Sequence, residues 1–387
     1  MKHDFDEVFD RRGTDSSKWR KYPADVLPMW VADSDFKCPQ VVVDAVTEFA
    51  RHGAYGYPYA DDGAFEQAAV EWMRKRFGWR AETSMVDFVP SLCTALALAV
   101  KSFTEEGDSV LMLTPVYPPF HAVAGYNHRL ASDCSLIWKN GSYHIDFDDF
   151  ERRAAEPRTK LFLHCHPHNP SGRAFTREEL ERIGDICLRH KVIIFSDEIH
   201  CDYVFRGKHI PMPTLSEEIA ANTVVGINPS KTFNIAGMRT AAVITPNKSL
   251  QARFQGVLRS CELGRNPFGV LAFVKAYREC DDYANQLYAY IEKNLDFAVD
   301  FLNTRCKGKI AAYKPDATYL LWLDCKELGL GRQEALEVFF LEKAKVALNS
   351  GTSFGIEGEG FMRLNTACPR ATLAEGLKRI EKAVQAL

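Results

Sequence analysis

The stretch FLHCHPHNPSG, residues 162–172, brings three histidines and one cysteine together in the sequence. In an extended strand, His164 and His166 project to the same face. A His-x-His pair of this kind, completed by Asp197 and His200, is a plausible metal site. One hypothesis is therefore a metal-dependent hydrolase that uses His164 and His166.

Three other residues in similar positions point to different chemistry. Lys231 lies in NPSKTFN (228–234), after an apolar run and next to the hydroxyl of Ser230. A buried lysine with a lowered pKa is a good carbonyl nucleophile and forms Schiff bases. Asp197 ends the run VIIFSD, where a carboxylate can bind a metal, cap a helix or pair with a cationic ring nitrogen. Asn169 opens an Asn-Pro-Ser-Gly turn that follows a strand-like run, so its side chain is available to a ligand.

Short apolar runs that alternate with amphipathic stretches must position these residues. Strand-like runs span 87–89, 109–113, 160–164, 192–196, 223–227 and 241–244, and helical periodicity spans 64–77 and 177–190. Thr176 and Glu179 predict a capping box at the start of the second helix. This alternation predicts βαβ units around a mostly parallel sheet, with ligands at the carboxyl ends of its strands.

The texture of the sequence changes after about residue 268. Long helical runs at 271–280 and 283–303 precede two strand-like runs, a helix at 333–345, another strand and a last helix at 372–387. Helices over a few separate strands predict a smaller α+β domain. We expect a large domain at 46–285, and a small domain formed by 1–45 with 286–387.

Composition excludes several classes of protein. The 387 residues carry 48 Lys and Arg against 51 Asp and Glu, so no basic excess points to nucleic acid. The N-terminus is too polar for a signal peptide, and no apolar run reaches membrane-spanning length. The 11 cysteines are odd in number and scattered, as expected of reduced thiols. We therefore expect a cytoplasmic protein without nucleic-acid or membrane partners.

The order of these motifs resembles the fold-type I pyridoxal-phosphate enzymes, the aspartate-aminotransferase superfamily, class I/II. The subgroup that it resembles is the MalY/PatB-type cystathionine β-lyases, or C–S lyases. The resemblance rests on MWVADSDF (29–36), YGYP (55–58), TPVYPPF (114–120), HNPSGR (168–173), SDEIH (196–200), PSKTFNIAG (229–237) and RLNTACPR (363–370). It implies a large domain with a mostly parallel seven-stranded sheet covered by helices, a smaller α+β domain, and pyridoxal 5′-phosphate as cofactor.

The resemblance also assigns roles around the cofactor ring. Lys231 is the lysine that binds the cofactor covalently and then accepts the substrate Cα proton. Asp197 is the partner of the ring nitrogen, and it keeps that nitrogen protonated so that the ring accepts electrons. Asn169 donates to the phenolic oxygen, and Tyr117 stacks on the ring. Lys231, Asp197 and Tyr117 form the catalytic set; His200 is left out of it.

The remaining roles concern the phosphate group, the substrate and the partner subunit. By matching position, the phosphate is bound by the backbone N–H groups of Leu92 and Cys93, the Ser230 hydroxyl and Arg239. Arg363 binds the substrate α-carboxylate with its planar fork. In a last match, Tyr57 reaches the cofactor and substrate of the partner subunit, which implies a homodimer with shared active sites.

The resemblance favours one reaction over two alternatives. It implies β-elimination from cystathionine or related S-substituted L-cysteines, which yields a thiol, pyruvate and ammonia. An aminotransferase acting on an amino acid is the main alternative, although Arg265 is the one evident candidate for a second carboxylate-binding arginine. In the metal-hydrolase hypothesis, His164 and His166 compete for space with Asn169, so we expect these histidines to pack around the pocket instead.

Overall fold

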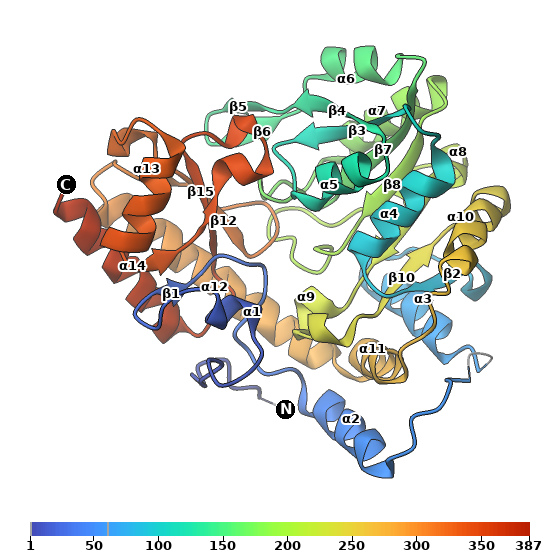
Figure 1. The fold of residues 1–387 in the computed structure, drawn as a ribbon, viewed down its shortest axis with the longest axis horizontal. Coiled ribbons are helices and arrows are strands. Elements are labelled where there is room, and N and C mark those ends of the chain that lie inside the picture. The colour runs from blue at the N-terminus through green and yellow to red at the C-terminus, as the bar shows by residue number, and fades with distance from the viewer. Residues whose placement is uncertain (1, 60–61) are drawn as a thin grey trace.

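A seven-stranded sheet forms the centre of the computed structural model, which describes residues 2–59 and 62–387 (Figure 1). Its strands, in spatial order, are β2 (Val86–Val89), β10 (Ala241–Ile244), β9 (Thr223–Ile227), β8 (Ile193–Asp197), β7 (Thr159–Cys165), β3 (Ser109–Thr114) and β4 (Leu130–Ser135). Only β10 among these strands runs antiparallel to its neighbours. The predicted α/β class with a mostly parallel sheet is confirmed.

Helices cover both faces of this sheet, which explains why its strands are apolar on both sides. One face packs against α4 (Leu92–Phe103), α5 (Pro119–Tyr126) and α10 (Lys248–Ser260). The other face packs against α6 (Phe147–Ala154), α7 (Arg177–Arg189) and α8 (Glu217–Ala221). The predicted capping box at the start of α7 is confirmed, because Thr176 and Glu179 each bond the other's backbone N–H.

A second, four-stranded antiparallel sheet lies at the left of Figure 1 with the C-terminal helices. Its order is β11 (Ala311–Ala312), β12 (Leu320–Asp324), β15 (Phe361–Asn365) and β14 (Asn349–Ser350). The helices around it are α12 (Asp281–Arg305), α13 (Gln333–Val338) and α14 (Arg370–Gln385), while α3 (Ala64–Phe77) and α11 (Pro267–Glu279) flank the large sheet. The division of the chain at residues 45 and 285 stays a prediction.

The helix expected over 333–345 is shorter than predicted. Helix α13 ends at Val338 and continues as a π-helical turn, Phe339–Lys343, closed by a bond from Ala344 N to Phe339 O. The chain leaves the helix there because Val346–Ala347 form strand β13, which pairs in parallel with β1 (Leu27–Pro28). The β1–β13 pairing was not visible in the local sequence pattern.

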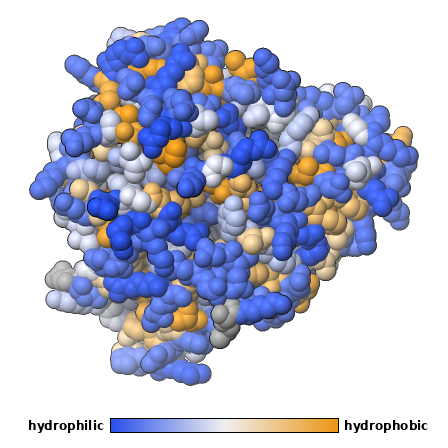
Figure 2. All heavy atoms as spheres, turned by 180° about the vertical axis from the view of Figure 1, so that it is seen from behind, coloured by the Kyte–Doolittle hydropathy of each residue, from blue (hydrophilic) through white to orange (hydrophobic). Residues whose placement is uncertain are grey.

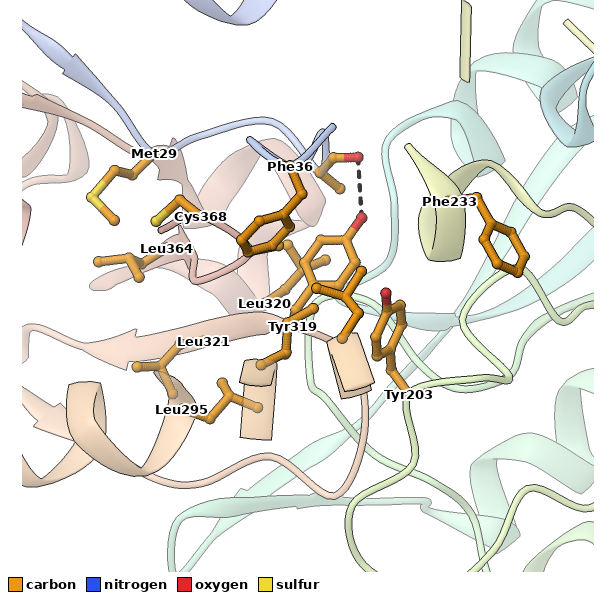
Figure 3. Packing of buried hydrophobic residues seen from close by; sticks show 14 of the residues in the cluster. Met29, Phe36, Tyr203, Phe233, Leu295, Tyr319, Leu320, Leu321, Leu364 and Cys368 are labelled. Carbon is orange, nitrogen blue, oxygen red and sulfur yellow. Dashed lines mark hydrogen bonds between the residues drawn. The ribbon is translucent and has the colours of Figure 1, made fainter. Parts of the chain in front are cut away.

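The N-terminal segment, in which we expected no strong element, contains α1 (Ser17–Arg20) and the 13-residue helix α2 (Gln40–His52). A further hairpin, β5 (Ile137–Lys139) and β6 (Ser142–His144), completes the strands. One continuous hydrophobic cluster joins the N-terminal segment, α3, α11, α12 and the small sheet. Figure 3 shows part of it, from Met29 and Phe36 to Leu295 and Leu364.

The surface is mostly hydrophilic in the view of Figure 2, with apolar side chains in separate patches. Within 2–59 and 62–387, no helix combines the length and apolar character that a membrane crossing requires. All eleven cysteines lie in this part of the chain and are free thiols.

Candidate active site

Three neighbouring strands of the large sheet bring the predicted residues to one edge. Strand β8 ends at Asp197, β7 ends four residues before Asn169, and β9 is followed by the short helix α9 (Ser230–Phe233), which carries Lys231. A backbone bond of 2.9 Å from His166 N to Asp197 O joins the first two strand ends. The local sequence therefore places three polar side chains where parallel strands end.

Lys231 has the environment of a reactive amine. Its Nζ donates to Ala32 O at 2.5 Å. Burial lowers the pKa of Lys231; the Asp33 carboxylate opposes this effect and the Arg363 guanidinium adds to it. A lowered pKa increases the fraction of unprotonated amine, which is the form that attacks a carbonyl.

Asp197 is a buried carboxylate with few partners. Its Oδ1 accepts from Ile199 N at 3.2 Å. Burial raises the pKa of Asp197 to about 7, although the Ile199 N–H and the Lys231 charge lower it in part. A cationic ring nitrogen placed against this carboxylate would supply the opposite charge that the burial requires.

Arg363 and Asn169 form one hydrogen-bonded unit. Arg363 Nη1 donates to Asn169 Oδ1 at 2.8 Å, and Nη2 donates to Asn349 Oδ1 at 2.6 Å and Trp30 O at 3.1 Å. The guanidinium lies 4.7 Å from the centre of the Phe354 ring. Arg363 Nε is buried without a partner, so the side chain has a donor left for an incoming carboxylate.

The start of α4 has the form of an anion-binding cradle. Ser91 Oγ caps the helix by accepting from Thr94 N at 3.1 Å, which leaves the earlier N–H groups of Leu92 and Cys93 directed beyond the helix end. Burial raises the pKa of the Cys93 thiol, Asp197 raises it further, and Lys231 and Arg239 lower it. Such mutual influence requires the cradle to lie near the lysine and the carboxylate.

Tyr117, Ser230 and Arg239 surround the same region. Burial raises the pKa of Tyr117, Cys93 adds to the increase, and the charge of Arg363 opposes it, so the phenol lies between the cradle and Arg363. Ser230 is buried beside Lys231, whereas Arg239 is exposed and adopts a left-handed backbone with φ 51°.

These residues fit the expected cofactor, pyridoxal 5′-phosphate. Lys231 offers an amine for its aldehyde, and Asp197 offers a buried carboxylate for its ring nitrogen. The helix start at Leu92 and Cys93 offers N–H groups for its phosphate. The partnerless Arg363 Nε remains for a substrate carboxylate.

Sequence reasoning missed the backbone of residues 30–33, which lines this site. Ala32 O accepts from Lys231 and also from the Tyr319 hydroxyl at 3.4 Å, the dashed line in Figure 3. Trp30 O accepts from Arg363. The motif MWVADSDF drew attention to this segment, but carbonyl oxygens leave no signature in a sequence.

A buried charge cluster holds the segment in place. Lys18 Nζ lies 2.7 Å from Asp35 Oδ2 and donates to Asp33 O at 2.8 Å. Arg11 pairs with both carboxylates, at 3.0 Å from Asp33 and 2.9 Å from Asp35. Asn365 Nδ2 donates to Asp33 O at 2.9 Å, which ties the segment to the small sheet.

The structure does not bring Tyr57 into this site within one chain, because its side chain is fully exposed. Arg265 is also elsewhere, paired with Glu66 and positioned 5.2 Å from the Phe65 ring centre. His200, which we left out of the catalytic set, is buried near the site: burial lowers its pKa, and the charges of Lys231 and Arg363 lower it further.

The histidine-rich stretch packs below the site. His164 and His166 stack at 5.2 Å, and burial lowers the pKa of His166 to about 3. His166 Nε2 lies 3.1 Å from Ile210 O, and His168 Nε2 lies 3.1 Å from Leu113 O. Across 2–59 and 62–387, no cluster of three or more His, Cys, Asp or Glu residues is arranged to hold a metal ion.

Comparisons with known proteins agree with this geometry. The model of the family "Aminotransferase class I and II" matches residues 24–380. The chain is 43% identical to "Cystathionine beta-lyase PatB" of Bacillus subtilis, over 98% of this chain and 99% of that protein. Two solved structures superpose with TM-scores of 0.95. One is a PLP-bound putative aminotransferase from Clostridium difficile 630, 38% identical, covering 99% and 100% of the two chains. The other is cystalysin from Treponema denticola, which contains pyridoxal 5′-phosphate, 32% identical and covering 100% of both. The chain therefore belongs to the aminotransferase class I and II family, as the order of its motifs predicted.

Proposed function

We propose that the chain is a pyridoxal-phosphate-dependent C–S β-lyase. It cleaves cystathionine or related S-substituted L-cysteines to a thiol, pyruvate and ammonia. The observation that carries this proposal is the 43% identity to a cystathionine β-lyase over nearly the whole length of both chains. The buried Lys231, Asp197 and Arg363 supply the groups that such a reaction needs.

The proton-transfer work falls to Lys231. When bound, pyridoxal 5′-phosphate supplies an aldehyde that condenses with amines and a ring that accepts electrons from the substrate Cα. Once its amine is free, Lys231 accepts the Cα proton, which its lowered pKa permits at neutral pH. Ala32 O, 2.5 Å from Nζ, holds that amine in position.

The other residues bind and orient. Asp197 holds the ring nitrogen protonated through a buried ion pair. Arg363 binds the substrate α-carboxylate through its free Nε, while its bonds to Asn169 and Asn349 fix the plane of the guanidinium. Asn169 uses Oδ1 for Arg363, so its Nδ2 group is the donor for the phenolic oxygen.

Transamination is a second candidate function, because a solved structure 38% identical to this chain is described as a putative aminotransferase. Both reactions begin with Cα deprotonation by Lys231. They differ in the next step: a thiolate leaves Cβ in the lyase, whereas Lys231 returns the proton to the cofactor in the transaminase. The same set of residues serves either reaction.

The assembly is proposed together with the reaction. We infer a cytoplasmic homodimer in which Tyr57 of one subunit reaches the cofactor and substrate of the other. The full exposure of Tyr57 supports this inference, since a tyrosine ring gains stability when a partner covers it. The eleven free thiols support a reducing compartment.

An absorption spectrum of the purified protein, recorded while L-cystathionine is added and pyruvate and ammonia are assayed, tests the function. A yellow protein that releases pyruvate and ammonia in equal amounts supports the lyase. Bleaching of the yellow band without pyruvate would move the function to transamination. A colourless protein that does not respond to added pyridoxal phosphate would overturn both.

A further inference from the structure

A second cavity, of about 630 Å³, lies outside the candidate active site. It is enclosed by the end of α3, the segment 201–209 and the first turns of α12. The residues that line it are Lys75, Arg76, Phe77, Gly78, Cys201, Asp202, Val204, Gly207, Lys208, His209, Asn285 and Tyr288. None of them has a role in the proposed reaction.

The charged side chains around this cavity are mostly basic. Lys75, Arg76 and Lys208 face one lining carboxylate, Asp202. Lys75 is paired with Asp281, whereas Arg76 Nε lies 3.6 Å from Asp202 Oδ1, beyond hydrogen-bonding distance. Lys208 is exposed. The positive charge on Arg76 and Lys208 is therefore only partly compensated, which favours an anion.

One bonded path joins the cavity to the lysine. The Thr232 hydroxyl donates to Asp202 Oδ2 at 2.6 Å, in a fully buried contact. Thr232 follows Lys231 in helix α9. An anion that draws the Arg76 guanidinium away from Asp202 would change the charge felt at the first turn of α9.

A second path joins the cavity to the carboxylate. His209 lines the cavity, and its Nε2 lies 2.7 Å from Glu198 Oε2, with both side chains buried. Glu198 follows Asp197 in the sequence and also accepts from the Ser196 hydroxyl at 3.0 Å. The immediate neighbours of both proposed catalytic residues are thus bonded to groups in the wall of this cavity.

We propose that this cavity binds a small oxyanion or carboxylate, and that its occupancy alters the protonation of the active site. Arg76 and Lys208 bind the anion. The contacts Asp202–Thr232 and His209–Glu198 transmit its charge. Binding is independent of the proposed function, whereas the transmitted effect rests on it.

Calorimetric titration of the cofactor-loaded protein with sodium sulfate, at constant ionic strength, tests the binding. One saturable site is expected, weakened about fivefold by Lys208→Ala and about tenfold by Arg76→Gln. Lys248→Ala, which removes another exposed lysine, is the matched control and leaves the affinity unchanged. Lys208 is exposed, so its variant tests the site even if the Arg76 variant does not fold.

Arg363→Lys separates this site from the substrate site. Sulfate binding that survives Arg363→Lys and weakens in Lys208→Ala supports the cavity. Binding lost in Arg363→Lys and unchanged in Lys208→Ala, or no saturable binding at all, overturns the proposal.

The pH midpoint of the bound cofactor's visible absorption tests the transmitted effect. Saturating sulfate is expected to shift this midpoint in the wild type and to shift it less in Thr232→Val, which lacks the hydroxyl bonded to Asp202. Identical midpoints with and without sulfate in the wild type would overturn the coupling. A protein that takes up no cofactor contradicts the proposed function instead, while sulfate binding can still be measured on it.

Discussion

Asp197 shows how one residue trades stability for function. Its folded-state pKa is raised to about 7 from an ordinary value of 3.8, mainly by burial. A carboxyl group with a raised pKa binds more protons in the folded state than in the unfolded state across that window. Its contribution to the free energy of unfolding therefore falls as pH rises from about 4 to 7. Without a cationic partner, the site is destabilised at neutral pH.

Asp197→Asn should therefore stabilise the cofactor-free protein at high pH. The amide cannot ionise, so the variant avoids a loss of up to roughly 4 kcal/mol at pH 8, relative to its difference from the wild type below pH 4. Urea unfolding of both cofactor-free proteins at pH 5 and pH 8 measures the gap. A gap that does not widen toward pH 8 would contradict the assigned burial of the charge. The same variant should bind pyridoxal phosphate without the charged ring partner and lose most of its activity.

The sequence allowed a prediction for each residue whose role depends on its position after a strand. Lys231, Asp197 and Asn169 each follow an apolar run, and the structure places all three on adjacent strand ends. The bond between Arg363 and Asn169 joins residues 194 positions apart, so no local pattern could predict it. Ala32 was out of reach for another reason: it acts through a backbone carbonyl, which every residue carries.

At the scale of elements, the segment 30–35 depends on a buried charge cluster. Lys18→Met removes the ammonium 2.7 Å from Asp35 Oδ2, although Arg11 and the Trp19 indole still bond the other carboxylate oxygen. The free energy of unfolding should fall by about 1–3 kcal/mol, because a buried carboxylate oxygen loses its charged donor. Substrate affinity should fall with it, since this segment supplies Trp30 O to Arg363.

Lys37→Met is the control for this change. Lys37 pairs with Glu7 in the same N-terminal region, but both side chains are exposed. Such a pair contributes under about 1 kcal/mol. Chemical denaturation of the two variants compares them directly, and equal losses would mean that the cluster does not anchor the segment.

Helix α11 packs so closely against the loop of Arg239 that it requires a glycine. A Cβ on Gly269 would lie 1.9 Å from Thr240 Oγ1 and 2.3 Å from Met238 O. Gly269→Ala should therefore lower stability by roughly 1–3 kcal/mol and weaken cofactor binding, because the residues on either side of Arg239 must move. Cofactor titration followed by absorbance, together with thermal unfolding, measures both effects.

Gly256 in α10 provides the comparison, since a Cβ there meets nothing within 4 Å. Gly256→Ala should be neutral or stabilising by up to about 1 kcal/mol, because alanine favours the helix. Unchanged cofactor affinity in Gly269→Ala would contradict the link between this packing and Arg239.

Prediction of elements succeeded where periodicity was strong and failed where pairing was distant. The strands of the large sheet are apolar on both faces, so their existence was visible; β10 differs from its neighbours only in direction, which composition does not encode. The π-helical turn after Val338 arises because Val346 must pair with Leu27, 319 residues earlier in the chain by their numbering. Contacts of that range are set by the whole fold.

At the scale of the whole molecule, the N-terminal segment and the small sheet share one hydrophobic cluster with α3 and α11 (Figure 3). The site therefore lies where three parts of the chain meet: strand ends of the large sheet, residues 30–33, and Arg363 on β15. In one chain this arrangement leaves Tyr57 exposed to solvent. A second subunit is the element that the predicted shared site still requires.

Mixing two inactive variants tests the shared site. Lys231→Ala should reduce turnover by roughly 10³-fold or more, because the base and the cofactor's amine partner are lost together. Tyr57→Ala should also lower activity strongly while leaving the fold intact, since the side chain is fully exposed in one chain. If sites are shared across a two-fold axis, each mixed dimer contains one site with both native residues and one site with neither.

Unfolding and refolding the two variants together in equal amounts should therefore recover activity. Random pairing makes half of the dimers mixed, and each has one native site, so about a quarter of wild-type activity is expected. Lys231→Ala combined with Tyr57→Ala in one chain, refolded with wild type, is the control: every mixed dimer then has two defective sites. Pyruvate release from L-cystathionine measures the outcome. Activity in the first mixture no greater than that of the separate variants would mean that Tyr57 does not act across the subunit boundary.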